Sequence, residues 1–351
     1  MCGIIAVLRR PSDRAVPEND EVLVPLADAV ALLGHGDPLA LARVADVLEG
    51  VDHLLGGVPG LMALDADPAL AGRIRAVLAP VPGLLDTVAG ALGGSDQMEE
   101  DNAALVRVRD AVWAVTRDRL GSHDGVSTLR STSPPPSDAG LAVLLSIQQA
   151  LSAIDRLEVR GRDSAGLQVT VWNHGIHPTD PMVVARLGDQ LHRSGSVRLL
   201  EGGALAFVVK VAAEIGELGD NTAAMRAALS TDGLLARALA APDVEGSLLG
   251  HTRWASVGLV CEPNAHPLDS TRADGRQTPV VMAVQNGDVD NHADLVVSDG
   301  LSVAPEITTD AKVVPALCAI HLAAGHDHRE AFRRTVSAFE GSLAIGAMVG
   351  D

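Results

Sequence analysis

The stretch Met1-Cys2-Gly3-Ile4-Ile5-Ala6-Val7 places a cysteine directly before a run of apolar residues that is typical of a buried strand. If Met1 is removed, Cys2 carries a thiol and a free α-amine on the same residue. The thiol is a nucleophile, and an α-amine, with an ordinary pKa of about 8, can take its proton directly or through a water. The stretch therefore predicts either an N-terminal nucleophile or simply a small apolar residue that starts a strand.

The bulk composition limits the classes of function. The chain has 351 residues, of which 47% are hydrophobic and 2% aromatic, and its formal net charge is -18. This size allows one large or two ordinary domains with an aliphatic core. An acidic chain repels nucleic acid and anionic membranes, so we expect neither as a partner.

The cysteines and the apolar runs indicate a compartment. Cys2, Cys261 and Cys318 form no Cys-x-x-Cys pair, which favours a reducing environment and predicts no metal site. The N-terminus has no signal-peptide pattern, and charged residues or proline interrupt each apolar run before it could span a bilayer. We therefore expect a cytoplasmic protein without a cofactor.

Residues 20–120 are rich in Ala, Leu, Val and Gly with helical spacing, which predicts a small helical bundle. Asp37-Pro38 and Asp67-Pro68 each match a helix start, with an N-cap residue followed by proline. A longer amphipathic helix is predicted over 98–120, with Trp113 in the core. The segment contains no pattern that indicates chemistry.

Residues 122–138 are rich in Ser, Thr, Pro and Gly, a composition typical of a linker. Ser137 or Asp138 then caps a predicted helix over 140–157. Beyond it we expect strands at 167–172, 182–186, 204–210, 247–252, 280–285 and 343–349, and helices at 211–241, 310–323 and 328–339. Strands outnumber long helices here, which predicts stacked sheets covered by helices.

Three polar clusters follow predicted strands. Arg253, within His251-Thr252-Arg253-Trp254-Ala255-Ser256, could grip a substrate carboxylate with both arms of its guanidinium, or it could form a surface ion pair. Asn286-Gly287 could form a hairpin turn, or it could supply an amide and a backbone N–H to an oxyanion. Asp310 could cap the following helix, or it could bind an ammonium.

Taken with Cys2, these clusters supply a nucleophile with its own base, a carboxylate binder, an ammonium binder and an oxyanion hole. A substrate that needs all four carries an α-amino acid head group and an acyl centre at the end of its side chain. Glutamine has this structure, and its amide would be hydrolysed through a thioester.

At this point the chain resembles the class II glutamine amidotransferases, which are N-terminal nucleophile hydrolases. Within them it is most similar to the glutaminase domain of the glucosamine-6-phosphate synthases. The matching stretches are Met1-Cys2-Gly3-Ile4, 157–166 (LEVRGRDSAG), 251–255 (HTRWA), 264–267 (NAHP), Asn286-Gly287 with Asn291-His292, and Thr309-Asp310.

The resemblance implies an α+β fold, a four-layer αββα sandwich. It implies Cys2 as nucleophile, Asn286 and the Gly287 N–H as oxyanion hole, Arg253 for the glutamine carboxylate and Asp310 for its ammonium. Trp254 and Ser256 would line the site and its loop. Ammonia would pass to a sugar isomerase domain in cis, which would convert fructose 6-phosphate to glucosamine 6-phosphate.

The chain also departs from that family. Residues 9–138 stand where the family has a short connection, and a smaller insertion lies near 211–245. Val257 and Gln285 stand where the synthases usually place histidine. The sequence stops at Asp351, before the closing strands and the isomerase domain, so we expect a domain cut short at its C-terminus.

These observations predict three segments: a glutaminase domain of 1–8 and 139–351, an all-α insertion of 9–121 and a linker of 122–138. The expected reaction converts glutamine to glutamate and ammonia. One alternative is a glutaminase that feeds a different acceptor. The other is a degenerate, non-catalytic domain whose helical insertion binds a partner.

Overall fold

A computed structural model describes residues 2–36, 40–91, 98–187, 193–212, 217–276 and 278–350. The chain divides into two compact units, each with its own core. One unit comprises Met1–Arg9 with Leu129–Asp351, and the other comprises Arg10–Thr128.

The first unit contains a five-stranded sheet among its described residues. Its order is β1 (Gly3–Leu8), β5 (Glu245–Arg253), β2 (Ser164–Trp172), β4 (Leu205–Val211) and β3 (Val197–Leu199). All neighbouring strands are antiparallel, with Gly3 opposite Thr252 and Ser164 opposite Arg253. The start of β1 and the end of β5 therefore lie at the same end of the sheet.

A second antiparallel sheet has the order β6 (Leu268–Asp269), β7 (Val281–Val289) and β8 (Gly341–Val349). The two sheets pack face to face. Leu249 of the first sheet and Val284 of the second belong to one buried cluster, against which Ile4 of β1 also packs. Burying these apolar faces against each other brings β1 and β7 together.

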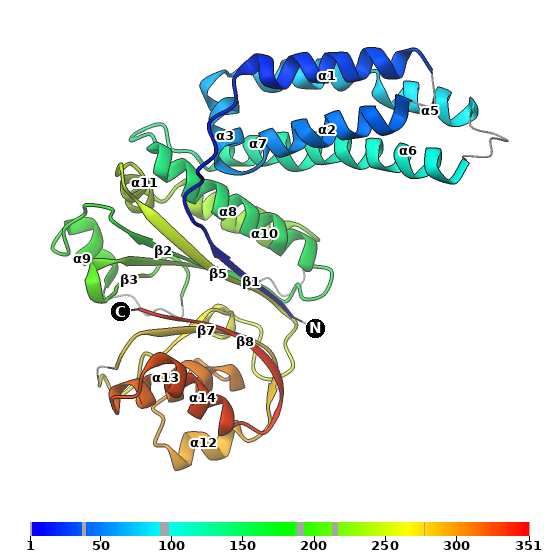
Figure 1. Ribbon diagram of the computed structural model, residues 1–351. Helices are drawn as coiled ribbons and strands as arrows, with labels where there is room; N and C mark the ends of the chain where they lie inside the picture. Colours follow the sequence, from blue (N-terminus) through cyan, green and yellow to red (C-terminus); the bar gives the residue numbers. More distant parts are fainter. Residues whose placement is uncertain are drawn as a thin grey trace. The chain divides into compact units, whose positions relative to one another are not determined.

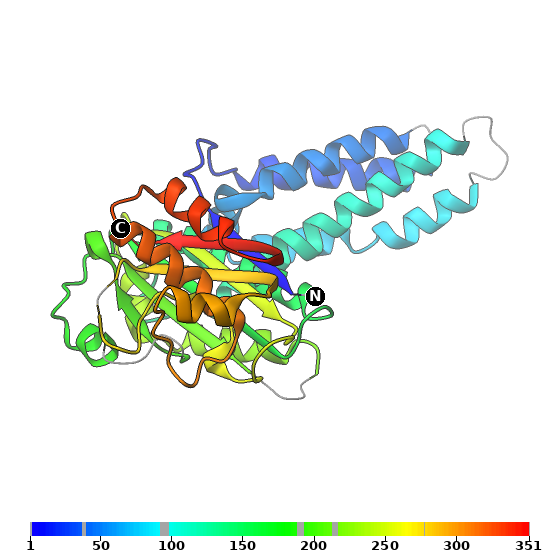
Figure 2. The ribbon, with the colours of Figure 1, turned by 90° about the horizontal axis from the view of Figure 1, so that it is seen from below.

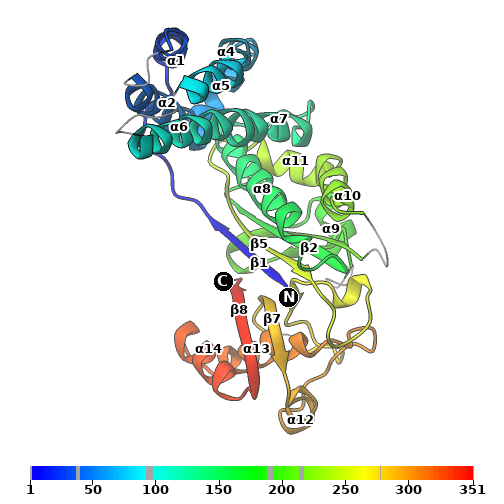
Figure 3. The same cartoon turned by 90° about the vertical axis from the view of Figure 1, so that its right-hand side faces the viewer.

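Helices cover the outer faces of both sheets. α8 (Asp138–Leu157), α10 (Asp220–Ser230) and α11 (Gly233–Leu239) lie on the outer side of the five-stranded sheet, and β7 and β8 lie on its other side (Figure 3). α13 (Val313–Ala323) and α14 (His328–Ser337) cover the second sheet, and α12 (His292–Ser298) packs beside α13 (Figures 1 and 2). The unit is thus a mixed α+β structure with antiparallel sheets, as predicted.

Most predicted elements of this unit form. α8 begins as expected, because the Ser137 Oγ accepts a hydrogen bond of 3.0 Å from the Gly140 N–H. The strand predicted at 182–186 is wrong, since these residues lie in helix α9 (Pro181–Leu187). Proline at the first helical position and the Asp180 carboxylate, 2.9 Å from the Met182 N–H, start that helix.

The helix predicted over 211–241 is also wrong in its extent. Val211 still belongs to β4, residues 213–216 lie outside the described residues, and the remainder forms two helices. The Asp232 carboxylate accepts from the backbone N–H groups of Leu234 and Leu235, both at 3.0 Å, and so starts α11 as a separate helix.

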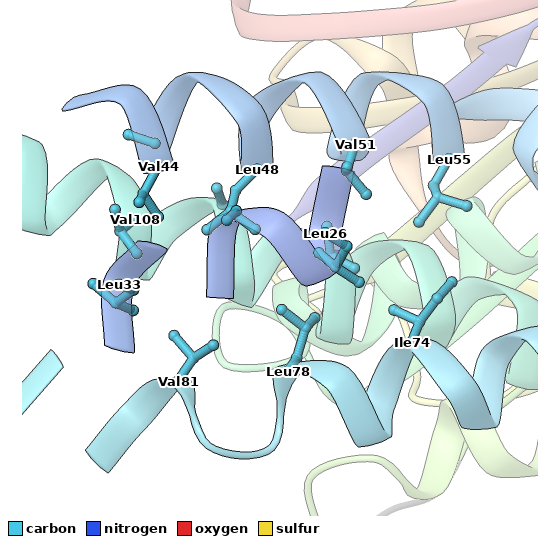
Figure 4. Packing of buried hydrophobic residues seen from close by; sticks show 14 of the residues in the cluster. Leu26, Leu33, Val44, Leu48, Val51, Leu55, Ile74, Leu78, Val81 and Val108 are labelled. Carbon is cyan, nitrogen blue, oxygen red and sulfur yellow. The ribbon is translucent and has the colours of Figure 1, made fainter. Parts of the chain in front are cut away.

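The second unit is helical, as predicted from its periodicity. Its elements are α1 (Asn19–Gly34), α2 (Leu41–Leu55), α3 (Gly57–Ala66), α4 (Leu70–Leu78), α5 (Val81–Ala91), α6 (Met98–Trp113), a π-helical segment Ala114–Arg119 and α7 (Leu120–Leu129). Leu26, Leu48 and Ile74 come from different helices and point into one aliphatic core (Figure 4). The helix start predicted at Asp37-Pro38 lies outside the described residues. The Asp67 carboxylate accepts from the Ala69 N–H, just before α4 begins.

Two expectations for this segment are wrong. Trp113 is 51% exposed, because the buried face of α6 carries Val108 and Ala111 instead. The predicted linker 122–138 is helical up to Leu129. Its Ser127 hydroxyl donates to the His123 carbonyl, so a hydroxyl residue is accommodated inside the helix while Leu129 is buried.

Among the described residues, no single helix is long and apolar enough to cross a membrane. Only α2 and α3 taken together, across a bend of 82°, meet that test of length and composition. The apolar residues of α2 are buried in the helical core, where Val44, Leu48 and Val51 pack.

Replacing Leu26 by alanine should unfold the helical unit more easily. The side chain is fully buried, so Leu26→Ala should lower the free energy of unfolding by about 3 kcal/mol. Val24 lies on the same helix but is 54% exposed, and Val24→Ala should change that free energy by less than about 0.5 kcal/mol. Urea unfolding followed by circular dichroism measures both, and equal effects would contradict this core assignment.

Candidate active site

Cys2 lies at the start of β1, against the last residues of β5. The Gly3 N–H donates to the Thr252 Oγ1 at 3.1 Å, which fixes the chain beside β5. The Trp254 N–H donates to the Cys2 Sγ at 3.3 Å, and the Trp254 carbonyl lies 3.6 Å from the same sulfur. The backbone of Trp254 therefore holds the thiol in one position.

Asn286 reaches Cys2 from the second sheet. The Cys2 backbone nitrogen donates to the Asn286 Oδ1 at 3.2 Å, across 284 residues of sequence. Because Oδ1 faces Cys2, the Nδ2 group remains as a donor, and it bonds to no residue that the structure describes. Asn286 and Gly287 both lie within strand β7. The alternative, that they form a hairpin turn, is therefore wrong.

The backbone conformation at position 287 requires a glycine. Its φ is +114°, and a Cβ atom there would lie 2.0 Å from the Ser342 carbonyl oxygen of β8. Only glycine fits this conformation without strain. The position thus allows β7 to continue past Asn286 while remaining paired with β8.

Burial raises the pKa of the Cys2 thiol. The Trp254 N–H and the charge of Arg253 lower it again, but by less than burial raises it. The sulfur is therefore mainly a thiol near neutral pH, and it needs a proton acceptor before it can act as a nucleophile.

The Arg253 side chain is buried, with 3% exposed. Its Nη1 donates to the Leu259 carbonyl at 3.0 Å and its Nη2 to the Val257 carbonyl. No described carboxylate forms an ion pair with it, so the alternative of a surface ion pair is wrong. Burial lowers the pKa of the guanidinium, while the nearby Cys2 and Asp310 raise it.

Asp310 is a buried carboxylate held by neutral donors. Its Oδ2 accepts from the Gln285 Nε2 at 2.9 Å and from the Val289 N–H at 2.8 Å. Its Oδ1 accepts from the Thr309 hydroxyl at 3.2 Å. The carboxylate is directed at β7 and caps no helix by its side chain, so the capping alternative is wrong.

Asn264 joins the loop after Arg253 to the loop before Asp310. Its Nδ2 donates to the Leu259 carbonyl at 3.0 Å and to the Thr308 Oγ1 at 2.9 Å. Its Oδ1 accepts from the N–H groups of Thr308 and Thr309, at 2.8 and 3.2 Å. The buried amide of Asn264 therefore fixes the loop after Arg253 relative to the loop before Asp310.

Trp254 and Ser256 lie on the loop that leaves β5. The Trp254 side chain is 58% exposed, and the Ser256 hydroxyl donates to the Asp288 carboxylate at 2.6 Å. The Asp163 carboxylate accepts from the Ala255 N–H at 2.8 Å and ties this loop to the start of β2. The Ser256 hydroxyl forms its hydrogen bond with Asp288 and not with Cys2.

Sequence reasoning missed the positioning groups Asp163, Asn264 and Gln285. Asp163 and Asn264 lie in stretches that matched the family, but no pattern in the sequence gives their hydrogen-bond partners. In the sequence, Gln285 stands out only as a departure from the histidine that is usual in the synthases. Its Nε2 in fact donates to both the Gly287 carbonyl, at 3.0 Å, and Asp310, so it links the two halves of the site.

Two buried histidines lie behind these residues. The rings of His251 and His266 are tilted by 33° with centroids 4.2 Å apart. Burial lowers the pKa of His251 to about 3 and the pKa of His266 well below its usual range. Both are therefore neutral at physiological pH. Within the described ranges, no group of three His, Cys, Asp or Glu side chains is placed to hold a metal ion.

Comparison with known proteins relates the chain to the glutamine amidotransferases. No family model matches it. Part of it is similar to proteins named glutamine–fructose-6-phosphate aminotransferase [isomerizing], which confirms the resemblance drawn from the motifs.

The matches cover limited parts of both chains. The protein from Geobacillus kaustophilus (strain HTA426) is 39% identical over 111 residues, which is 31% of this chain and 17% of that protein. The protein from Mesorhizobium japonicum is 37% identical over 118 residues, 32% of this chain and 18% of that protein. The protein from Bacillus thuringiensis subsp. konkukian is 28% identical over 199 residues, 56% and 24% respectively. The chain thus spans about a quarter or less of these relatives.

Removal of the Asn264 amide should destabilise the site. Asn264→Ala leaves the N–H groups of Thr308 and Thr309 without their acceptor, which should lower the free energy of unfolding by about 3 kcal/mol. Asn102 is exposed on α6, so Asn102→Ala should have little effect. Denaturant unfolding compares the two, and an Asn264→Ala protein as stable as the control would contradict the role of this amide.

Proposed function

We propose that the unit of Met1–Arg9 with Leu129–Asp351 is a class II glutamine amidotransferase domain, which hydrolyses glutamine to glutamate and ammonia. The proposal rests on one observation. Cys2 contacts Asn286 through its backbone nitrogen and Trp254 through its sulfur, so a potential nucleophile, base and oxyanion donor meet at one point.

The N-terminal amine would act as the base. After removal of Met1, the Cys2 α-amine takes the thiol proton, and the sulfur attacks the carboxamide carbon of glutamine. The tetrahedral oxyanion accepts hydrogen bonds from the Asn286 Nδ2 and the Gly287 N–H. The α-ammonium then returns the proton to the leaving nitrogen, which departs as ammonia and leaves a thioester on Cys2.

Water completes the reaction. The same α-amine removes a proton from a water molecule as it attacks the thioester carbonyl, and the second oxyanion uses the same two donors. Collapse of this intermediate expels the sulfur, which regains its proton and releases glutamate. The raised pKa of the thiol supports the need for such a base.

Arg253 and Asp310 would bind the amino acid head group. The Arg253 guanidinium uses carbonyl groups as its partners, so its charge remains available to the glutamine carboxylate. The Asp310 carboxylate has only neutral donors among the described residues and would bind the α-ammonium. Trp254 and Ser256 would line the site on the loop after β5.

The layers of this unit support the same assignment. Helices α8 and α10, the two stacked sheets, and helices α13 and α14 follow one another as expected for a four-layer αββα sandwich of the N-terminal nucleophile hydrolases. In this proposal Arg10–Thr128 is an all-α insertion between β1 and α8, so its end at Thr128 replaces the expected end at 121.

The acceptor of the ammonia follows only from the names of the relatives. They name fructose 6-phosphate as the acceptor, and we infer synthesis of glucosamine 6-phosphate with a sugar isomerase domain in cis. Such a synthesis would take place in the cytoplasm. A glutaminase with another acceptor is the second candidate. Val257 and Gln285, which replace the histidines usual in the synthases, favour it over an unchanged synthase.

Cys2→Ala should abolish glutamine hydrolysis, because no other described thiol contacts Asn286. Release of glutamate by purified protein measures the rate, and intact mass shows whether Met1 has been removed. Cys318 is buried on α13, away from these contacts, and Cys318→Ala should retain activity. A glutamine-like electrophile should modify Cys2 alone. Unchanged turnover in Cys2→Ala would reject the mechanism.

The pH dependence should report the α-amine. The amine acts as a base only when it is neutral, so kcat/KM should rise with pH to a plateau above its pKa of about 8. His251, whose pKa lies at about 3, stays neutral throughout that range and should add no step. Rates measured from about pH 5.5 to 9 test this, and a midpoint at the ordinary histidine pKa of about 6.5 would contradict it.

A further inference from the structure

A cavity of about 410 Å³ lies beside β3, at the edge of the five-stranded sheet opposite β1. It is therefore remote in the sheet order from the candidate site at Cys2. Its described lining comes from the end of α9, from β3 and from the segment that precedes β7.

The lining is basic in an acidic chain. It contains Arg198, Arg272 and Arg276, and no described lining residue is acidic. The whole chain has 45 acidic residues against 27 lysines and arginines, so a cavity of this composition is unusual for it. A concave surface with several guanidinium groups attracts anions.

Arg198 is held in place without being neutralised. Its Nη1 donates to the Thr271 Oγ1 at 2.9 Å, and no described carboxylate bonds to it. The hydroxyl of Thr271 in turn donates to the buried Asp269 carboxylate at 2.7 Å. That carboxylate is paired with the buried Lys312 at 3.2 Å, and the nearby charge of Arg198 also lowers its pKa, so one carboxylate serves two cations.

The guanidinium of Arg272 is held in place by two neighbouring groups. Its guanidinium bonds to Asp274 at 2.6 Å and to the Gly300 carbonyl at 3.1 Å. Asp274 also accepts from the Arg276 N–H at 3.1 Å, which orders the loop between the two arginines. Arg276 is 79% exposed in its side chain, and its guanidinium lies 3.8 Å from Asp274, so it can turn toward a ligand.

The balance of charge therefore favours a bound anion. Three guanidinium groups (Arg198, Arg272 and Arg276) line the cavity, and the Asp274 carboxylate lies within ion-pair distance of only two of them, Arg272 and Arg276. Guanidinium groups bind phosphate oxygens through paired charge-assisted hydrogen bonds. A phosphate dianion would compensate the excess positive charge.

The rest of the lining limits the ligand further. The other described residues are aliphatic or carry hydroxyl groups, including Leu199, Val280, Thr271 and Thr278, and none is aromatic. A nucleobase would find no ring to stack on. The volume suits a small organic molecule, and the threonine oxygens can accept from hydroxyl groups of that molecule.

We propose that this cavity binds the phosphate ester of a small polyhydroxy compound, with Arg198 and Arg276 on the phosphate and Arg272 beside them. The site is separate from Cys2 and does not depend on the glutaminase reaction. Its ligand is defined by a phosphate monoester joined to several hydroxyl groups, as in a phosphorylated sugar.

Isothermal titration of the full chain with glucose 6-phosphate tests this proposal. We expect saturable binding of one molecule per chain. Arg198→Gln should raise Kd by about tenfold, since it removes one charge-assisted contact. Arg276→Gln should raise Kd by about threefold, and because this side chain is exposed, its replacement should leave the fold intact. Circular dichroism checks the fold of both variants.

The matched control is Arg333→Gln, which removes the same charge from α14, where Arg333 pairs with Glu330. Its Kd should change by less than about twofold. Absence of saturable binding, or equal weakening in Arg333→Gln and Arg198→Gln, would overturn the site. Tighter binding of inorganic phosphate or of ADP than of glucose 6-phosphate would overturn the class of ligand. Glutamate release by the same variants should be unchanged, so this result and the proposed glutaminase function are tested separately.

Discussion

The face-to-face burial of two antiparallel sheets is the constraint on which the candidate active site depends. Cys2 starts an edge strand of one sheet, and Asn286 lies on the central strand of the other. Their hydrogen bond requires the two sheets to stack in one register, which the apolar contact of Leu249 with Val284 provides. A shift of one residue along β7 would turn Asn286 to the opposite face and remove it from Cys2.

The buried charges of Arg253 and Asp310 are stabilised without an ion-pair partner among the described residues. Burying a charge is costly unless hydrogen bonds compensate it, yet these two groups do not pair with each other. Arg253 bonds to carbonyl groups and Asp310 to neutral donors, while Asn264 joins the loops beside them. Each charge is thus kept stable, and no carboxylate or cation that the structure describes is in direct contact with it. In the proposed function, the zwitterionic head group of glutamine supplies the opposite charge for each of the two residues.

Much of this site could be predicted from sequence, because its side chains follow strand ends and strands have a simple pattern. The predictions failed where local composition and tertiary burial disagree. Residues 122–129 have linker composition but form the helix that buries Leu129, and the apolar run at 182–186 is helical. A tryptophan in an amphipathic helix is expected in the core, yet Trp113 is half exposed. The partners of Asn264 and Gln285 could not be predicted, since each bonds to groups that only folding brings near.

The described arginines have partners of two kinds, carboxylates and neutral oxygens. In the helical unit, Arg107 bonds to Asp46 and Glu49, and Arg119 bonds to Asp52, so their charges are neutralised within the protein. Arg253 and Arg198 lie in a chain with an excess of acidic residues, yet they bond to carbonyl groups and to a hydroxyl. Neutral partners fix the direction of a guanidinium without cancelling its charge. The same physical arrangement therefore supports a carboxylate site at one edge of the sheet and a phosphate site at the other.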